Sequence, residues 1–285
     1  MTPDADPNAQ REESLKSWDK SAPGWGRRAE RMRAIGMPVS MWMLERLALQ
    51  PGQRVLELAA GPGDTGFLAA ELIRPGGTLI CSDASGAMLT VARERARQLQ
   101  IDNVEFGELE LEWIDLPAAG VDAVLCRWGV MLCVDPGASV REMRRVLRPG
   151  GRVSLAVWDD RALNPWGTIP ATALVNLGYA SPPDPNAPGP FALAAPGRLQ
   201  ELLENAGFVE VIVEPIEAGR AEVDVGSFVE ETLDISQRFA EVYERLSESQ
   251  RAEVAHEIAS LAEPFTDADG SLRLPGRSLV GAASA

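Results

Sequence analysis

The sequence predicts an α/β protein built on a doubly wound, mostly parallel sheet. Between residues 55 and 158, short apolar runs of strand length alternate with segments in which apolar residues recur at helical spacing. Such alternation is typical of parallel strands joined by right-handed crossovers. The first run, residues 55–58, leads into a glycine-rich turn at 61–66, as expected at the ligand-binding edge of such a sheet.

The N-terminal part of the chain precedes this alternation. Residues 1–10 are rich in proline and aspartate, and we expect them to be disordered. Residues 11–33 have a helical pattern that is interrupted at 21–26, which predicts two short helices on either side of a loop. A further helix is expected at 37–49, before a proline and a glycine lead into the first strand.

The elements of the core follow from apolar spacing and from local capping signals. Ser85 and Asp135 precede two of the expected helices, and both residue types are favoured at the N-cap. The expected order after the glycine turn is helix 65–73, strand 78–82, helix 86–99, strand 104–107, strand 122–127, helix 136–147 and strand 152–158.

After residue 158 the alternation of strands and helices ends. A helix-like segment opens at 164–166, and the loop at 182–190 contains too many prolines for a regular element. The remaining expected elements are helix 196–206, strand 208–213, two amphipathic helices at about 227–246 and 249–263, and a closing strand within 271–282.

The glycine turn fits a nucleotide-binding pattern. Gly61, Gly63 and Gly66 match G-x-G-x-x-G, which alone is a weak signal because glycine loops also occur in turns that bind nothing. Asp83 strengthens the pattern, since it lies twenty residues after Gly63 at the end of the next apolar run. A carboxylate there can accept both hydroxyls of a ribose. This much fits NAD and S-adenosylmethionine equally.

Three acids near the turn separate these two cofactors. Glu57 lies inside the first strand, where a dinucleotide site usually has an apolar residue because the pyrophosphate is already an anion. Glu108 follows the third expected strand, where an acid can accept from the adenine amino group. With Asp64 in the turn and no lysine or arginine nearby, these acids favour a cationic sulfonium ligand over a phosphate.

Several stretches together resemble the class I S-adenosylmethionine-dependent methyltransferases, in particular the small-molecule branch similar to ubiquinone/menaquinone-biosynthesis methyltransferases. They are residues 55–66, Asp83, 107–110, 121–128 and 145–151. The resemblance covers roughly residues 10–160 and is looser towards the end of the chain. It departs from the family at residues 60–63, where Cys-Gly-Thr-Gly is more frequent than Ala-Gly-Pro-Gly, and at Glu108, where Asp is more usual.

The resemblance implies a Rossmann-like, seven-stranded sheet with helical lid insertions, in which the final strand is antiparallel. It also implies a division of the chain. The expected parts are an N-terminal tail and lid helices at 1–36, a cofactor-binding core at 37–160, a lid insertion at 161–195, and the remainder of the sheet at 196–285 with a helical cap at about 227–264.

The resemblance further implies S-adenosylmethionine as the cofactor, with S-adenosylhomocysteine as its product. The expected cofactor contacts are Glu57, Ala59, Gly61, Gly63, Asp83, Ala84, Met88, Glu108, Leu109 and Arg127. Trp18 and Trp25 in the lid segment, and Trp128 after the fourth strand, are expected to border cofactor or substrate. For the two lid indoles, pinning the lid to the core is an equally good interpretation, and packing alone explains Met88.

Composition restricts the partners. The net charge of −15 would repel a phosphate backbone, so a small-molecule substrate is expected and a nucleic acid is not. No stretch of about 18 apolar residues occurs and the N-terminus is acidic and polar, so we expect no membrane insertion and a cytoplasmic location. The oligomeric state is open between monomer and homodimer.

Two further residue groups receive ordinary structural interpretations. The three cysteines lack metal-ligand spacing and are expected in the core, so no metal is expected. The arginines of helix 86–99 alternate along it and favour a solvated face. The residues concerned are Cys81, Cys126 and Cys133, and Arg93, Arg95 and Arg97.

The sequence therefore favours an enzyme that transfers a methyl group from S-adenosylmethionine to oxygen or carbon of a small, partly apolar or aromatic molecule. Such a transfer depends on positioning and on exclusion of water, and an oxygen nucleophile also gains from a general base. Asp19 and His256 are candidates for the base, although each is also typical of a surface residue.

Two alternatives remain. One is a methyltransferase-fold protein that binds S-adenosylmethionine but regulates or catalyses a different reaction, which the lack of an assignable base leaves open. The other is an NAD-linked oxidoreductase, which only the glycine pattern with Asp83 supports.

Overall fold

The computed structural model describes residues 6–184, 187–222 and 224–285, and within them seven strands form one sheet. The strand order is β3-β2-β1-β4-β5-β9-β6. β9 pairs antiparallel with both β5 and β6, and the other pairings are parallel. The predicted fold class, including the antiparallel final strand, is confirmed. The strands are β1 Arg54–Glu57, β2 Thr78–Asp83, β3 Val104–Glu108, β4 Val121–Arg127, β5 Leu147–Trp158, β6 Val209–Glu217 and β9 Arg277–Ser284.

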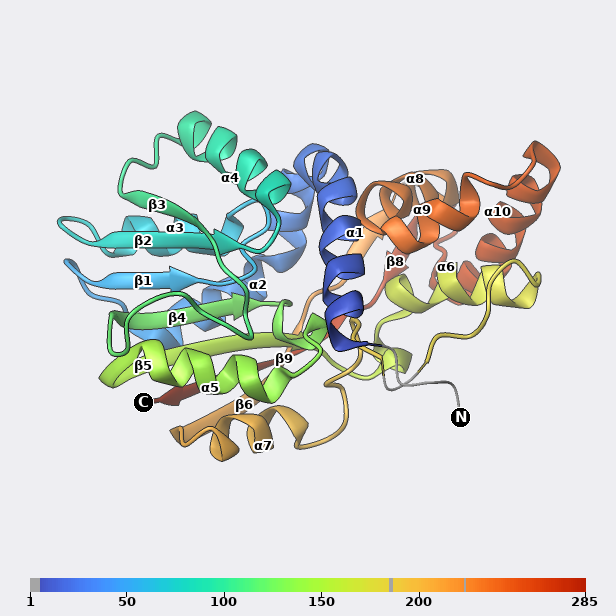
Figure 1. The fold of residues 1–285 in the computed structure, drawn as a ribbon. Coiled ribbons are helices and arrows are strands. Elements are labelled where there is room, and N and C mark those ends of the chain that lie inside the picture. Colours follow the sequence, from blue (N-terminus) through green and yellow to red (C-terminus); the bar gives the residue numbers. More distant parts are fainter. Residues whose placement is uncertain (1–5, 185–186, 223) are drawn as a thin grey trace.

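Helices cover both faces of this sheet (Figure 1). α3 and α4 connect β1 to β2 and β2 to β3, and α2 packs beside α3 on the same face. α5 connects β4 to β5 on the opposite face, where it contacts α7. The core lies between these layers, with strand residues such as Val55, Leu56 and Val124 fully buried. The helices are α2 Ala29–Leu47, α3 Asp64–Leu72, α4 Gly86–Leu99, α5 Pro136–Val146 and α7 Arg198–Asn205.

A second group of elements, here called the cap, lies beyond the carboxyl ends of the strands. It has its own buried cluster, which includes Ile169, Phe228, Val254 and Leu272. The cap comprises α6 Pro165–Asn176, β7 Arg220–Glu222, α8 Val225–Ile235, α9 Gln237–Tyr243, α10 Glu248–Ala262 and β8 Leu272–Leu274, which pairs with β7. Three single-turn helices occupy Val130–Leu132, Arg161–Leu163 and Glu263–Phe265.

Helix α1, Pro7–Arg27, stands between the sheet and the cap (Figure 1). It packs against α4 on one side and against α8 on the other. Ion pairs fasten it on both sides: Arg11 binds Glu112 after β3, and Lys20 binds Glu241 of α9. The N-terminal helix therefore connects the sheet side of the molecule with the cap.

Five local expectations about the chain are wrong. α1 is continuous through residues 21–26, and α2 begins at Ala29 rather than at 37. The expected helix 227–246 is divided at Ser236, whose side chain caps α9, and the last apolar run is divided into β8 and β9. Disorder was expected for residues 1–10, but residues 7–10 belong to α1; residues 1–5 lie outside the described part.

Tertiary packing explains the continuity of α1. Ala22 and Gly24 are buried, and a Cβ at Gly24 would overlap the backbone carbonyl of Asp234 in α8. The glycine that suggested a loop thus permits close helix packing, which outweighs the low helix propensity of Pro23 and Gly24.

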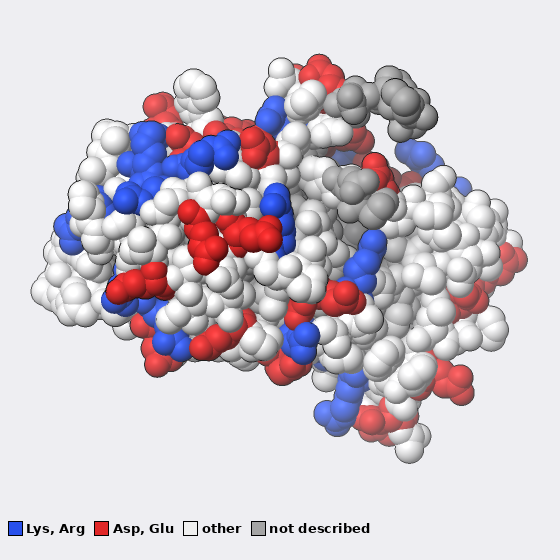
Figure 2. Space-filling view, turned by 90° about the horizontal axis from the view of Figure 1, so that it is seen from below, with Lys and Arg blue, Asp and Glu red and all other residues white. Residues whose placement is uncertain are grey.

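Among the residues that the structure describes, no helix is long and apolar enough to cross a membrane. Acidic and basic side chains are interspersed over the face shown in Figure 2. The cysteines at 81 and 126 are buried and free, as predicted.

Candidate functional site

The candidate site lies where β1 and β4 lie side by side while their crossover helices leave in opposite directions. In doubly wound sheets, ligands bind in the crevice that this reversal opens at the carboxyl ends of the strands. Here the crevice is bordered by the turn after β1, and Gly61 and Gly63 in that turn have φ of +52° and +86°. No described atom lies within 4 Å of the place where a Cβ at Gly61 would stand, so this glycine borders open space. A Cβ at Gly63 would instead overlap the Phe67 ring.

Asp83 at the tip of β2 braces this turn. Its carboxylate accepts hydrogen bonds from the backbone N–H of Gly61 at 2.8 Å and of Ser85 at 2.9 Å. Burial raises the pKa of Asp83 above its usual 3.8, although both backbone N–H groups act in the opposite direction. Asp83 is therefore placed beside the glycine turn, as the sequence pattern predicts.

Glu57 at the end of β1 is buried beneath the turn, with 3% of its surface exposed. Its Oε1 accepts from the backbone N–H of Gly66 at 2.7 Å, and its Oε2 has no hydrogen-bond partner among the described residues. Burial raises the pKa of Glu57 to about 8, against the Gly66 hydrogen bond. Its Oε2 lies where a Cβ at Gly66 would be, so the carboxylate faces the start of α3.

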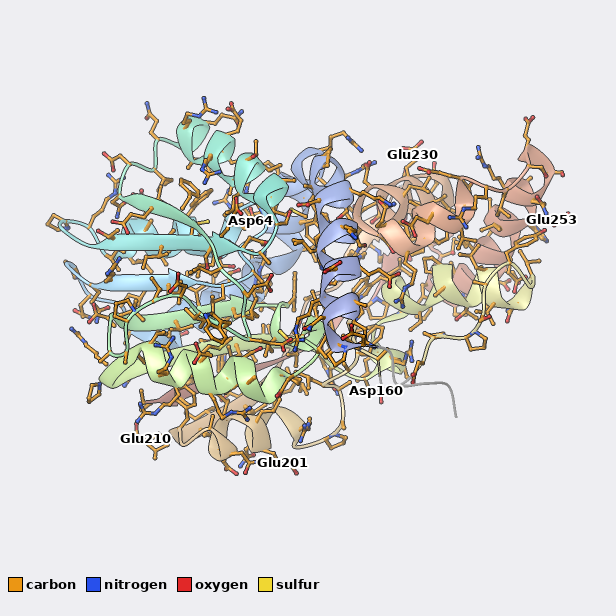
Figure 3. The ribbon with its side chains drawn as sticks, viewed as in Figure 1. Asp64, Asp160, Glu201, Glu210, Glu230 and Glu253 are labelled. Atoms are coloured by element: carbon orange, nitrogen blue, oxygen red, sulfur yellow. The ribbon has the colours of Figure 1, made fainter. Side chains whose placement is uncertain are left out.

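Asp64, at the first position of α3, has cationic partners that the sequence did not indicate. Its Oδ1 accepts from Arg95 at 2.6 Å and its Oδ2 from Arg127 at 3.4 Å. The expectations that no cation lies near Asp64 and that Arg95 is solvated are both wrong. Arg95 is only 7% exposed, and its position falls on the same helical stripe as Met88 and Ala92, which is the signal that could have revealed it. Figure 3 shows Asp64 between α4 and α1.

Arg127 and Trp128 end β4 next to the turn. Burial lowers the pKa of Arg127 below its usual value, and Asp64 opposes that change. Its guanidinium packs against Gly36 of α2, where a Cβ would overlap it, and lies 4.5 Å from the centre of the Trp128 ring. Trp128 has a positive φ of 61°, which is uncommon for a bulky residue and is typical of functional sites.

An aromatic column extends from Trp128 to the cap. Trp128 stacks on Trp158 with 4.3 Å between ring centres, and Trp158 lies 4.5 Å from Trp166 of α6. The Arg220 guanidinium of β7 lies 4.2 Å from the Trp166 ring. The column thereby connects the end of β4 with the cap.

The tips of β2 and β3 carry the remaining expected contacts. Glu108 pairs in register with Asp83 and is exposed, and its carboxylate approaches Gly86 at the start of α4. Leu109 and Met88 are buried, while Ala84 is half-buried. Ala59 has a positive φ of 49° in the turn itself. These residues therefore lie after β1, at the carboxyl ends of β2 and β3, or in the first turn of α4.

The lid residues have specific partners. The half-buried rings of Trp18 and Trp25 lie 6.1 Å apart, and the Trp25 indole N–H donates to the Ile235 carbonyl of the cap at 3.2 Å. Asp19 accepts from the Ser85 hydroxyl at 2.6 Å, which brings it beside the Asp83 loop. These contacts fasten α1 both to the loop after β2 and to the cap.

His256 lies elsewhere. It is exposed on α10, on the far side of α1 from the glycine turn (Figure 1). Among the described residues, no hydrogen bond links His256 to the turn. No group of three or more potential metal ligands occurs in the described part of the chain.

Comparison with known proteins shows that part of this chain is similar to methyltransferases. Residues 49–175 match the family model described as a methyltransferase domain. Over 122 residues the chain is 33% identical to the ubiquinone/menaquinone biosynthesis C-methyltransferase UbiE of Pasteurella multocida. The alignment spans 42% of this chain and 46% of that protein. The chain thus spans about half the length of the curated relatives it matches.

Solved structures share the fold. The YcgJ protein from Bacillus subtilis is 17% identical, with a TM-score of 0.57 over 86% of this chain and 97% of that one. The [4+2]-cyclase SpnF is 19% identical, with a TM-score of 0.54 over 86% of this chain and 80% of that one. At these identities the likeness concerns the fold alone.

Proposed function

Since residues 49–175 form a class I S-adenosylmethionine-dependent methyltransferase domain, we propose that this protein transfers a methyl group from S-adenosylmethionine to a small molecule. The acceptor atom is oxygen or carbon, and the molecule is partly apolar or aromatic. The observation that carries the proposal is the glycine turn, which borders open space at Gly61 and is braced by the Asp83 carboxylate.

The electrostatics of the turn support this cofactor over a dinucleotide. Glu57, Asp64 and Asp83 all lie around the turn, and the two buried arginines near it are both engaged by Asp64. The Asp83 carboxylate, which braces the turn beside the open space at Gly61, would repel a pyrophosphate seated on that turn, whereas a cationic nucleoside would be attracted to it. The same argument disfavours an NAD-linked oxidoreductase.

We assign roles to individual residues on this basis. Asp83 holds the ribose, since its carboxylate keeps lone pairs free beside its two backbone partners. Ala84, Met88 and Leu109 form the apolar wall for adenine, and Glu108 accepts from its amino group. Ala59, Gly61, Gly63 and Arg127 border the methionine portion, while Glu57 shapes the turn from beneath.

The cofactor supplies a methyl group that its sulfonium already activates. The contribution of the chain is to bind, to orient and to exclude water. The Trp128 ring is covered by stacked Trp158 and by the Arg127 guanidinium, so we assign it to anchoring the end of β4, and we propose α1, which carries Trp18 and Trp25, as part of the lid. Asp19 is held by Ser85, so we assign no side chain as general base.

Calorimetric titration tests the cofactor. We expect saturable binding of S-adenosylhomocysteine and none of NAD; the reverse would refute the assignment. Gly61→Arg should abolish binding because its side chain would enter the open space at the turn. Gly52→Arg is the matched control, since Gly52 also has a positive φ, +85°, with no described atom within 4 Å of its Cβ position, but lies before β1.

Mass spectrometry of candidate phenols and activated ring compounds tests the reaction. Methyl transfer predicts that a methyl group replaces one hydrogen in the product, and that Gly61→Arg prevents the change. Binding without any such product would favour a protein of this fold that regulates or catalyses another reaction. The absence of an assigned base is the observation that keeps this second candidate.

The remaining features of the proposal concern context. The net charge of −15 supports a substrate other than nucleic acid, and we propose a cytoplasmic monomer or homodimer. We also propose that α1 and the cap act as the lid over the core at 37–160, with the insertion at 161–195 contributing α6.

A further inference from the structure

Arg95 of α4 is a buried cation behind the glycine turn. Its Nη1 donates to the Pro62 carbonyl at 2.8 Å and to Asp64 Oδ1 at 2.6 Å. Its Nη2 donates to Glu30 Oε1 at 2.7 Å. One guanidinium therefore connects the turn, the start of α3 and the start of α2.

The two Nη1 contacts fix the part of the turn that faces away from the open space. Pro62 lies between Gly61, whose N–H donates to Asp83, and Gly63, whose N–H donates to the Ala60 carbonyl at 2.9 Å; Arg95 adds the contact to the Pro62 carbonyl. A guanidinium keeps its donors in a rigid plane, so binding a carbonyl and a carboxylate together defines their relative position. Arg95 thus restrains the backbone that approaches the cofactor.

The third contact reaches the N-terminal helices. Glu30 lies in the first turn of α2, two residues after Arg28, where α1 ends. The Glu30 side chain is 70% exposed, whereas the Arg95 side chain is 9% exposed. The ion pair is therefore accessible to salt at the Glu30 end and protected at the turn.

We propose that Arg95 is a positioning residue for the cofactor. It holds the glycine turn in its binding conformation, and through Glu30 it makes that conformation depend on the seating of the N-terminal helices. The inference rests on the proposed function, because the ligand whose affinity reports on the turn is S-adenosylhomocysteine.

Two variants of Arg95 separate positioning from simple stability. Arg95→Met removes the guanidinium, while Asp64 keeps Arg127 as its cationic partner, so the buried carboxylate is not left unpaired. Arg95→Lys is a second variant, which retains the charge but loses the rigid fork. Arg97→Met, on the exposed face of the same helix, is the matched control.

The measurement is calorimetric titration with S-adenosylhomocysteine, together with the melting temperature of each variant. We expect the Met variant to bind about tenfold more weakly, the Lys variant about threefold to tenfold more weakly, and the control like the wild type, as follows from losing hydrogen bonds to charged groups. In turnover assays, KM for the cofactor should rise more than kcat falls. Folded variants that bind within about twofold of the wild type would overturn the inference.

Glu30→Gln tests the connection to the N-terminal helices. We expect a loss of affinity of about twofold to threefold at low salt, and no difference from the wild type at about 0.5 M salt, where the exposed pair is screened. Equal affinity at low salt would refute this part. If the wild type itself failed to bind S-adenosylhomocysteine, the proposed function would be wrong, which is a different outcome.

Discussion

Glu57→Gln should make the free energy of unfolding depend less on pH. Burial raises the pKa of Glu57 from its ordinary 4.5 to about 8, so the folded protein binds this proton more tightly than the unfolded chain. A carboxyl with a raised pKa contributes stability below pH 4.5 that is lost as the pH rises to about 8. Each pH unit within this window costs about 1.4 kcal/mol, so the wild type should lose about 3 kcal/mol between about pH 5.5 and about pH 7.5.

The glutamine variant preserves the shape of the site. Its amide oxygen can accept from the Gly66 N–H as Oε1 of Glu57 does, and the uncharged amide needs no ionisation in the buried position. The free energy of unfolding of Glu57→Gln should therefore change with pH by about 3 kcal/mol less than that of the wild type over the same range. Asp64, Asp83 and Arg127, which also act on Glu57, are present in both proteins.

Urea denaturation followed by circular dichroism at the two pH values measures the difference. Glu105→Gln is the matched control, because Glu105 lies on β3 of the same sheet with an exposed side chain, and it should keep the wild-type profile. Identical pH profiles for the wild type and Glu57→Gln would refute the reasoning. They would mean that Glu57 is already ionised at about pH 5.5 and is stabilised by Arg127 despite its burial.

Three further outcomes follow from contacts at the turn and in the lid. Asp83→Ala should weaken S-adenosylhomocysteine binding by about 1.5–3 kcal/mol in calorimetry, and unchanged affinity would remove the ribose assignment. Trp25→Phe keeps a six-membered aromatic ring but removes the pyrrole ring and its N–H bond to the cap. Urea denaturation should therefore show a loss of at least about 1 kcal/mol in the free energy of unfolding, with the KM for the acceptor molecule unaltered. A higher KM for the acceptor without a loss of stability would place the indole at the substrate. Gly24→Ala should destabilise the protein by about 1–3 kcal/mol, because its methyl group meets the Asp234 backbone, whereas Gly26→Ala should be tolerated; equal melting temperatures would contradict the close packing of α1.

Local signals sufficed for much of the core. The helix after Ser85 was predicted at 86–99 and is observed there, because an N-cap side chain and a regular apolar stripe are properties of neighbouring residues. The same holds for the helix after Asp135, whose side chain caps it as expected. The fold class followed from the alternation of such elements.

Contacts between distant segments were not available from the sequence. Residues 21–26 contain proline and glycine and suggest a loop, yet packing against α8 keeps them helical. Arg95 and Asp64 lie far apart in the chain, so their pairing required the crossover geometry of the sheet. Glu57 was expected inside the first strand, but only the structure shows that its carboxylate faces the start of α3.

The route by which small molecules reach the crevice follows from how the cap is attached. In the described chain, the backbone crosses between sheet and cap four times, after β5, before α7, after β6 and before β9. Because four backbone connections join the cap to the sheet, a hinge motion of the cap would also have to displace the ends of β5, β6 and β9. α1 meets α2 at Arg28 and is held to the loop after β3 and to the cap by side-chain contacts. Displacing α1 would therefore open access to the turn without moving the cap.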